Sequence, residues 1–186
     1  MTTGLFGGTF DPPHNGHVAL VETAREHFGL ERVFVFVVVA PGHRTVTLDV
    51  ANRYELASLA FEGIPGTEVV PEEHGYTVDA VRDGRYGDAI FLVGADEFAG
   101  FLGWKDPNDV LEHVRLGVAT RPGHDPEDFR PVLAQLERPD RVEFFDIPPV
   151  PVSSSEIRAR LAREEPVRGL VPDPVADAIE ARGLYR

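Results

Sequence analysis

The chain has 186 residues, about the length of one ordinary domain, and 42% of them are hydrophobic, which is enough for a core of its own. It contains no cysteine, which excludes disulfides, thiolate metal sites and cysteine nucleophiles. The net charge of -13 opposes broad binding to nucleic acid or to anionic membranes. No stretch is apolar enough to span a bilayer and no signal peptide is evident, so we expect a single cytoplasmic domain over residues 1–186.

Short apolar runs rich in β-branched and aromatic residues alternate with segments of helical spacing along the chain. The six predicted strands are the run around Leu5 and residues 32–40, 67–70, 88–94, 115–120 and 141–147. The predicted helices are residues 16–28, 51–61, 106–113, 126–136, 153–163 and 173–181. Near-continuous apolar strands that alternate with helices indicate a parallel sheet covered on both faces. We therefore expect an α/β fold, a Rossmann-like doubly wound parallel sheet of about six strands with a small C-terminal helical end.

The stretch GGTFDPPHNGH, from Gly7 to His17, lies where the first strand passes into the first helix. In open parallel sheets, ligands bind beyond the carboxyl ends of the strands. Gly7 and Gly8 allow a tight turn and a close approach of a ligand to the backbone, and the helix start offers free N–H groups. His14 and His17 are three residues apart at that start, so both rings can face one anion. The stretch therefore indicates a phosphate site, although it is neither a Walker A loop nor a GxGxxG motif.

Two other interpretations of this stretch stay open. It can be an ordinary connection between a strand and a helix, with Asn15 or Gly16 at the cap. Alternatively, Asp11, His14 and His17 can ligate a metal ion, but the fourth ligand that such a site requires is not evident.

A second polar stretch, SSSEIR, begins at Ser153. Ser153 and Glu156 have the spacing of a helix capping box. Ser153, Ser154 and Ser155 also place three hydroxyls at a helix start, and Arg158 follows one turn later with a guanidinium that can bind an anion in bidentate fashion. A helix cap and a second polyanion site are compatible at this position.

Together, the two stretches resemble the signatures of the HxGH-type nucleotidyltransferase superfamily. Further matches resemble one branch of it, the bacterial nicotinate-nucleotide adenylyltransferases. These matches are PGHR at 41–44, YTVDAV at 76–81, GADEF at 94–98, Trp104, RPG at 121–123 and GLYR at 183–186. The chain departs from the family pattern at Gly42, where a second proline is usual, at Ala80, where threonine is usual, and at Lys105, where some members have an aromatic residue.

The resemblance implies transfer of the adenylyl group of ATP to nicotinate mononucleotide, which gives deamido-NAD and pyrophosphate, with Mg²⁺ bound through the ATP phosphates rather than by protein ligands. The implied catalytic residues are His14, His17 and Arg158. The implied ATP-binding residues are Gly7, Gly8, Thr9, Phe10, His14, His17, Gly94, Asp96, Arg121, Ser153, Ser154, Ser155 and Arg158. The residues implied for the mononucleotide are Arg44, Thr77, Trp104 and Lys105. In the family, the tryptophan stacks on the pyridine ring, and N–H groups near Thr77 and Lys105 receive the nicotinate carboxylate.

In-line attack on a phosphorus atom requires positioning and charge stabilisation rather than a covalent nucleophile, so the lack of cysteine is no obstacle. Three alternatives stay open. The acceptor can be that of another enzyme of the superfamily, such as nicotinamide mononucleotide or pantetheine phosphate; the chain can be a nucleotide sensor without transfer; and Trp104 can simply anchor its loop to the surface. The expected partners are small molecules and neither nucleic acid nor membrane, and whether the chain forms a homo-oligomer is left open.

Overall fold

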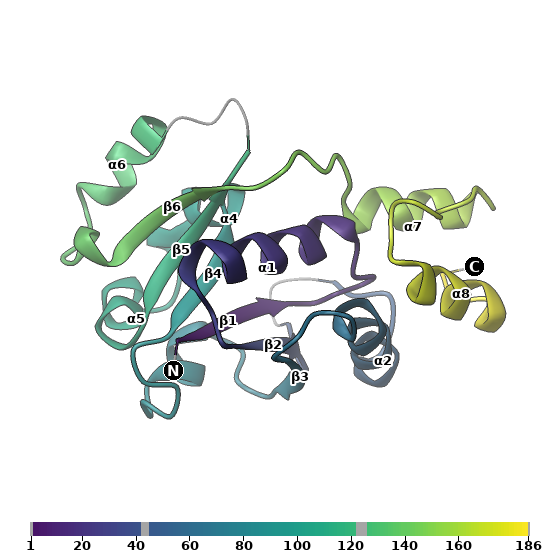
Figure 1. The fold of residues 1–186 in the computed structure, drawn as a ribbon, viewed down its shortest axis with the longest axis horizontal. Helices are drawn as coiled ribbons and strands as arrows, with labels where there is room; N and C mark the ends of the chain where they lie inside the picture. Colours follow the sequence, from purple (N-terminus) through teal and green to yellow (C-terminus); the bar gives the residue numbers. More distant parts are fainter. Residues whose placement is uncertain (1, 42–44, 122–125, 186) are drawn as a thin grey trace.

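The structure, a computed structural model, describes residues 2–41, 45–121 and 126–185. Six parallel strands form one sheet in the order β3-β2-β1-β4-β5-β6 (Figure 1). The strands are β1 Thr3–Gly8, β2 Arg32–Val38, β3 Thr67–Glu72, β4 Ile90–Gly94, β5 Arg115–Thr120 and β6 Val142–Asp146. From β1 the chain adds β2 and β3 towards one edge of the sheet, and it then returns to the centre to add β4, β5 and β6 towards the other edge. The direction of strand addition therefore reverses between β1 and β4. This is the predicted Rossmann-like doubly wound sheet, and the prediction is confirmed.

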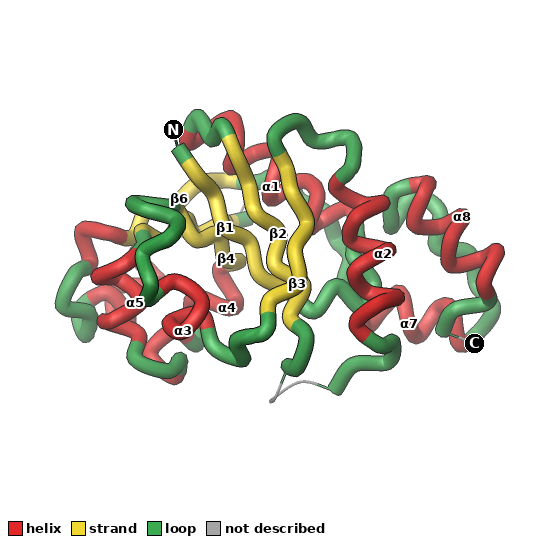
Figure 2. Tube along the Cα trace, turned by 90° about the horizontal axis from the view of Figure 1, so that it is seen from below, coloured by secondary structure: helices red, strands yellow, loops and turns green. Residues whose placement is uncertain are grey.

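The helices cover both faces of the sheet, as the continuous apolar strands require. They are α1 Asn15–Phe28, α2 Val50–Phe61, α3 Thr77–Val81, α4 Ala95–Ala99, α5 Pro107–His113, α6 Arg130–Leu133, α7 Ser154–Ala162 and α8 Asp173–Arg182. Within the described residues there are also 3₁₀ turns at Phe101–Gly103, Pro126–Phe129 and Pro139–Arg141. Figure 2 shows α3, α4 and α5 on one side of the sheet and α2, α7 and α8 on the other.

Two hydrophobic clusters fill the space between the sheet and its helices. Neighbouring residues of one strand enter different clusters, because side chains alternate between the two faces of a sheet. In β1, Phe6 packs with α1 and α2, whereas Leu5 packs with α3, α4 and α5. The C-terminal helices join the first cluster through Ile157 of α7 and Ile179 of α8. The expected helical end of the chain therefore packs against the core beside α2.

The structure differs from the sequence-based expectation at residues 126–136. These residues form a 3₁₀ turn, Pro126–Phe129, and a short helix, Arg130–Leu133, rather than one long helix. Pro131 has no N–H group and its ring excludes the carbonyl of the preceding turn, so a helix can start near it but cannot run through it. The short helices α3 and α4 escaped prediction because five residues are too few to show a helical period. None of the helices within the described ranges is both long and apolar enough to cross a bilayer.

Candidate active site

The loop after β1 lies at the point where the strand order reverses, and its shape depends on glycine and on Phe10. A Cβ atom on Gly8 would lie 2.9 Å from the ring of Phe10, so only glycine fits there. Phe10 has a left-handed backbone with φ of 50° and is 1% exposed. Its ring packs edge-on against Phe6 and His17. The side chain of Phe10 thus belongs to the core, which leaves its main chain to face a ligand.

His14 and His17 lie together at the start of α1. His14 is the N-cap residue, and its backbone N–H donates a hydrogen bond to Nδ1 of His17 at 3.2 Å. The two rings stack with their centroids 3.7 Å apart and their planes 18° apart. A Cβ atom on Gly16 would lie 3.1 Å from the ring of His14. Glycine between the two histidines therefore gives the first ring room beside the second.

The two imidazoles are neutral at physiological pH. Burial lowers the pKa of His14 to about 4, and the charge of Arg121 contributes in the same direction. Burial also lowers the pKa of His17 well below its usual value, with the neighbouring His14 as a second cause. Because Nδ1 of His17 accepts a hydrogen bond, the ring proton belongs on Nε2, which is a donor. Nδ1 of His14 is buried and has no hydrogen-bond partner among the described residues. The pair therefore offers polar nitrogens to a ligand without carrying a full charge.

The serine-rich stretch starts α7, as predicted. Ser153 is the N-cap residue, and its side chain accepts a hydrogen bond from the N–H of Glu156 at 3.2 Å. The second half of the predicted capping box is wrong. The carboxylate of Glu156 accepts a hydrogen bond from Arg160, one turn later, at 2.9 Å instead of returning to the cap. An ion pair at this helical spacing competes directly with the capping contact.

The start of α7 docks onto the loop after β1, so the two stretches that the sequence singled out form one site. Nη1 of Arg158 donates a hydrogen bond to the main-chain oxygen of Asp11 at 2.6 Å. Nη2 of Arg158 donates to the hydroxyl of Ser155 at 3.3 Å, and the hydroxyl of Ser154 donates to the carbonyl of Pro12 at 2.8 Å. Each contact to the loop joins residues more than 140 positions apart in the sequence. The predicted polyanion-binding groups therefore stand beside the two histidines.

The loops after β4 and β5 border the same edge of the sheet. Gly94 ends β4 and is the N-cap residue of α4, and Asp96 is exposed in the first turn of that helix. Arg121 follows β5, is exposed, and lies close enough to His14 for its charge to lower the pKa of that ring. The predicted ATP-binding residues thus come from the ends of three strands and from the start of α7.

Three of the residues expected for the mononucleotide, Thr77, Trp104 and Lys105, come from two segments that side-chain contacts hold together. Nζ of Lys105 lies 2.8 Å from a carboxylate oxygen of Asp79 and 5.0 Å from the centroid of the Tyr76 ring. These contacts bring the segment with Trp104 beside the start of α3 at Thr77. Asp79 lies in the YTVDAV stretch, but no local pattern in the sequence predicts that its carboxylate pairs with Lys105.

Trp104 is partly buried, with its ring edge-on to Phe101 at 5.2 Å and to Phe91 at 6.2 Å. This packing fits an anchored ring, and it leaves part of the indole exposed for stacking. Both interpretations of Trp104 therefore stay open. Arg44, the fourth residue expected for the mononucleotide, lies outside the described residues, as does Gly42.

Sequence reasoning missed Arg53, which is 1% exposed on α2. Its guanidinium donates hydrogen bonds to four main-chain carbonyls at 2.8–3.2 Å, those of Thr9, Val38, Val39 and Leu48. Arg53 therefore holds the ends of β1 and β2 and the segment before α2 in one arrangement. No sequence signal could have found it, because an arginine on an amphipathic helix is usually solvated.

Asp11 is 2% exposed, and donors occupy both of its carboxylate oxygens. Oδ2 accepts the N–H of Thr47 at 2.5 Å, and Oδ1 accepts the N–H of Leu48 at 3.2 Å and the hydroxyl of Tyr185 at 2.9 Å. Among the described residues, no three histidine or carboxylate side chains are placed to hold a metal ion. The contacts of Asp11 thus give no support to the metal interpretation of this loop.

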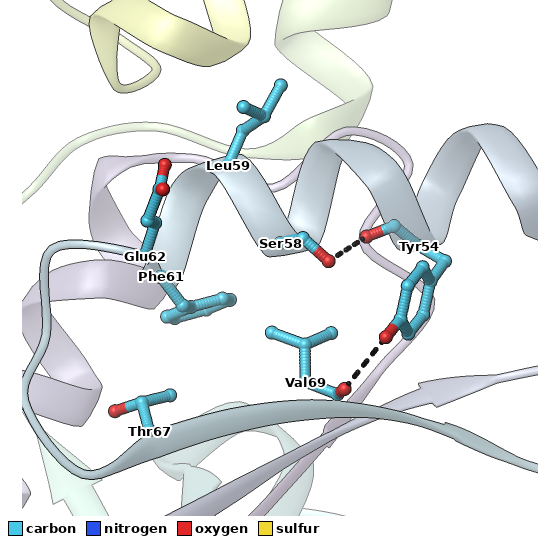
Figure 3. A pocket seen from close by; sticks show the side chains of 7 residues that line it. All are labelled: Tyr54, Ser58, Leu59, Phe61, Glu62, Thr67 and Val69. Atoms are coloured by element: carbon cyan, nitrogen blue, oxygen red, sulfur yellow. Dashed lines mark hydrogen bonds between the residues drawn. The ribbon is translucent and has the colours of Figure 1, made fainter.

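A separate hollow of about 350 Å³ lies between α2 and β3 (Figure 3). Its lining residues are Tyr54, Ser58, Leu59, Phe61, Glu62, Thr67 and Val69. The hydroxyl of Tyr54 donates to the carbonyl of Val69 at 3.1 Å across this hollow. None of the predicted site residues contributes to it, so the hollow is not the site described above.

Comparison with known proteins identifies the family. The cytidylyltransferase-like family matches residues 5–160. A probable nicotinate-nucleotide adenylyltransferase from Dictyoglomus thermophilum is 37% identical over the whole of both chains. One from Bordetella avium is 38% identical over 98% of this chain and 97% of its own. The chain belongs to the nicotinate-nucleotide adenylyltransferases.

Solved structures agree on the fold of this adenylyltransferase family member. The Plasmodium falciparum nicotinic acid mononucleotide adenylyltransferase complexed with NaAD superimposes with a TM-score of 0.80 over 99% of this chain and 97% of its own, at 15% identity. The same enzyme complexed with APC gives a TM-score of 0.79. The relatives thus confirm the family resemblance that the sequence suggested, and the solved structures confirm the fold.

The neutral histidines predict a pH dependence of folding stability. The pKa of each histidine is below 6.5 in the folded protein and near 6.5 in the unfolded chain. At a pH between these two values, the unfolded chain therefore binds more protons than the folded protein. The free energy of unfolding should fall as the pH drops from about 6.5 towards 5, by about 1.4 kcal/mol per pH unit for each fully shifted histidine. Urea titrations across this range would measure it. In the His14→Asn/His17→Asn variant the slope should be shallower, and parallel curves for the two proteins would contradict the assignment.

Proposed function

We propose that this protein transfers the adenylyl group of ATP to nicotinate mononucleotide and releases pyrophosphate, forming deamido-NAD for NAD biosynthesis. The loop after β1 leads into the HxGH motif at His14–His17, and we call it the HxGH loop. The observation that carries the proposal is the docking of Arg158 and the serine-rich start of α7 onto this loop, at the point where the strand order reverses. Ligands bind at this point in doubly wound sheets. The names of the full-length relatives supply the acceptor.

The described residues suit a displacement at phosphorus. The phosphate of the mononucleotide attacks the α-phosphorus of ATP, the bond to the bridging oxygen breaks, and pyrophosphate leaves with the electron pair. His14 and His17 donate hydrogen bonds to the phosphoryl oxygens as neutral imidazoles, and Arg158 stabilises the leaving pyrophosphate as its charge grows. Arg121, at the same edge of the sheet, adds positive charge to a protein whose net charge is -13.

Transferases of this kind generally use a divalent metal ion, and we propose Mg²⁺, carried on the ATP phosphates. The site fits this, because the loop after β1 and the start of α7 offer imidazoles, hydroxyls and a guanidinium group, whereas the buried carboxylate of Asp11 is occupied by donors. In proteins Mg²⁺ is commonly bound through substrate phosphates. The ion would supply charge neutralisation of the triphosphate.

For the mononucleotide, we propose stacking of its pyridine ring on Trp104 and binding of its carboxylate by N–H groups near Thr77 and Lys105. The contacts of Lys105 with Asp79 and Tyr76 support this, since they hold the two donor segments side by side. We propose that Arg44 meets the phosphate. Gly7, Gly8, Thr9 and Phe10 would approach ATP through the backbone, and the carboxylate of Asp96 would take ribose hydroxyls beside Gly94.

We further propose that residues 1–186 act as one domain in the cytoplasm. The shared hydrophobic cluster of the sheet with α7 and α8 supports a single domain, and the absence of cysteine fits a reducing compartment.

Pyrophosphate release with ATP and three candidate acceptors tests the proposed function. We expect turnover with nicotinate mononucleotide and at least roughly 10-fold lower kcat/KM with nicotinamide mononucleotide, because an amide leaves buried donors unpaired, at about 1–3 kcal/mol each. Faster turnover with pantetheine phosphate would replace the proposed acceptor. Binding of ATP without release with any acceptor would favour the nucleotide sensor.

Replacing His17 with alanine should lower kcat by roughly 10²–10³, the usual loss for one transition-state donor, while mononucleotide affinity changes less. The matched control is His27→Ala, because His27 lies exposed at the other end of α1 and contacts Glu143. Steady-state kinetics measure the effect, and circular dichroism checks the fold. A folded His17→Ala variant with near wild-type kcat would remove His17 from the catalytic residues.

Replacing Trp104 with alanine should weaken mononucleotide binding by about 1–3 kcal/mol, the usual value of stacking on an aromatic side chain, and leave ATP binding unchanged. Trp104→Phe keeps an aromatic ring, so its loss of mononucleotide affinity should be smaller. Calorimetric titrations with each substrate measure both affinities. An equal loss of ATP affinity would show that Trp104 only anchors its loop.

A further inference from the structure

Tyr185, in the C-terminal GLYR stretch, makes a hydrogen bond that has no role in the function proposed so far. Helix α8 ends at Gly183, whose left-handed backbone has φ of 61°, and the N–H of Leu184 bonds back to the carbonyl of Ile179 at 3.0 Å. This turn directs the chain back towards the sheet. Tyr185 follows it, and its hydroxyl donates a hydrogen bond to Oδ1 of Asp11 at 2.9 Å. The residues joined are 174 positions apart.

Asp11 links three other parts of the molecule to the HxGH loop. Its carboxylate accepts the N–H groups of Thr47 and Leu48, which precede α2, and the hydroxyl of Tyr185. Its main-chain oxygen accepts a hydrogen bond from Arg158. One buried residue thus contacts the arginine that is expected to bind the leaving group.

The hydroxyl of Tyr185 remains a donor at every physiological pH. Burial raises the pKa of Tyr185, and the nearby charge of Asp11 raises it further, while Arg158 and Arg53 act in the opposite direction. A buried carboxylate that loses one of its donors becomes free to reorient towards a new partner or towards water, because unpaired buried charge is costly. Arg158 is one such partner, since its guanidinium already contacts the main chain of Asp11.

We propose that Tyr185 is a positioning residue for adenylyl transfer: its hydroxyl orients Asp11, and Asp11 in turn places Arg158 against the HxGH loop. Tyr185 acts through Asp11 and does not itself contact substrate. The proposal rests on the proposed function, because it concerns the rate of that reaction.

Tyr185→Phe tests the proposal by removing the hydroxyl and keeping the ring. We expect kcat for adenylyl transfer to fall about 10- to 100-fold, the range for losing a hydrogen bond to a charged group, and to fall by a larger factor than the KM of ATP rises. The matched control is Tyr54→Phe, whose hydroxyl bonds a carbonyl outside the site. Its kcat should stay within about twofold of wild type.

A second comparison separates positioning from a structural role. If Tyr185 acts through Arg158, adding Tyr185→Phe to an Arg158→Ala variant should change kcat by less than about twofold, because the residue that it positions is gone. If the factor by which Tyr185→Phe lowers kcat is the same in the wild type and in the Arg158→Ala variant, the proposal is overturned. A lower Tm for Tyr185→Phe with wild-type kcat in the folded protein would also overturn it, since the hydroxyl would then only stabilise the fold.

Asp11→Asn provides the same test if Tyr185→Phe yields no folded protein. The amide keeps the size of the side chain and removes its charge, so kcat should fall and the loss should disappear in the Arg158→Ala background. Unchanged kcat would overturn the proposal. Failure of the proposed function is distinguishable: the wild-type protein would then release no pyrophosphate with any acceptor, whereas an active wild type with an unaffected Tyr185→Phe variant overturns the positioning role alone.

Discussion

Two buried side chains of opposite charge, Arg53 and Asp11, hold the loops that form the proposed active site. Among the described residues, neither forms a salt bridge. The guanidinium of Arg53 bonds to main-chain carbonyls, and the carboxylate of Asp11 bonds to two N–H groups and a phenol. Burial lowers the pKa of Arg53, and the charge of Asp11 opposes that shift. Burying such charges is tolerated only when their hydrogen bonds are made, so removal of either group would leave several loop carbonyls or N–H groups without partners. The arrangement of the site is therefore coupled to the core.

This arrangement explains how an acidic protein can bind a polyanion. The net charge is -13, but the groups around the HxGH loop include imidazoles, hydroxyls, helix N-termini and the side chains of Arg121 and Arg158. The histidines remain uncharged because burial and nearby positive charge lower their pKa values. Neutral donors at a helix start stabilise charge that grows during phosphoryl transfer without binding resting phosphate as strongly as a cation would. Full positive charge comes from Arg158 and Arg121, whose positions come from α7 and β5.

A different kind of contact joins the two segments that are proposed to bind the acceptor. Lys105 and Asp79 form an ion pair that is partly exposed, so its net contribution to stability is small. Its effect is geometric, because it holds the segment after the 3₁₀ turn Phe101–Gly103 against the start of α3. The departure of this chain from the family pattern at Lys105 thus coincides with a contact between the two segments expected to bind the nicotinate carboxylate.

The sequence by itself determined the α/β class, the strand boundaries to within about two residues, and the two stretches that meet at the site. These features depend on local causes: apolar runs, the Ser153 cap, and glycines that allow the turn at Phe10 and the stacked histidines. Tertiary structure alone decided that Arg158 binds the main chain of Asp11 and that Arg53 is buried. Such contacts join residues that the strand order brings together, and no local pattern encodes that order. The division of residues 126–136 into a 3₁₀ turn and a short helix is an intermediate case. Pro131 indicates an interruption, but the helical spacing of the surrounding residues predicts one continuous helix.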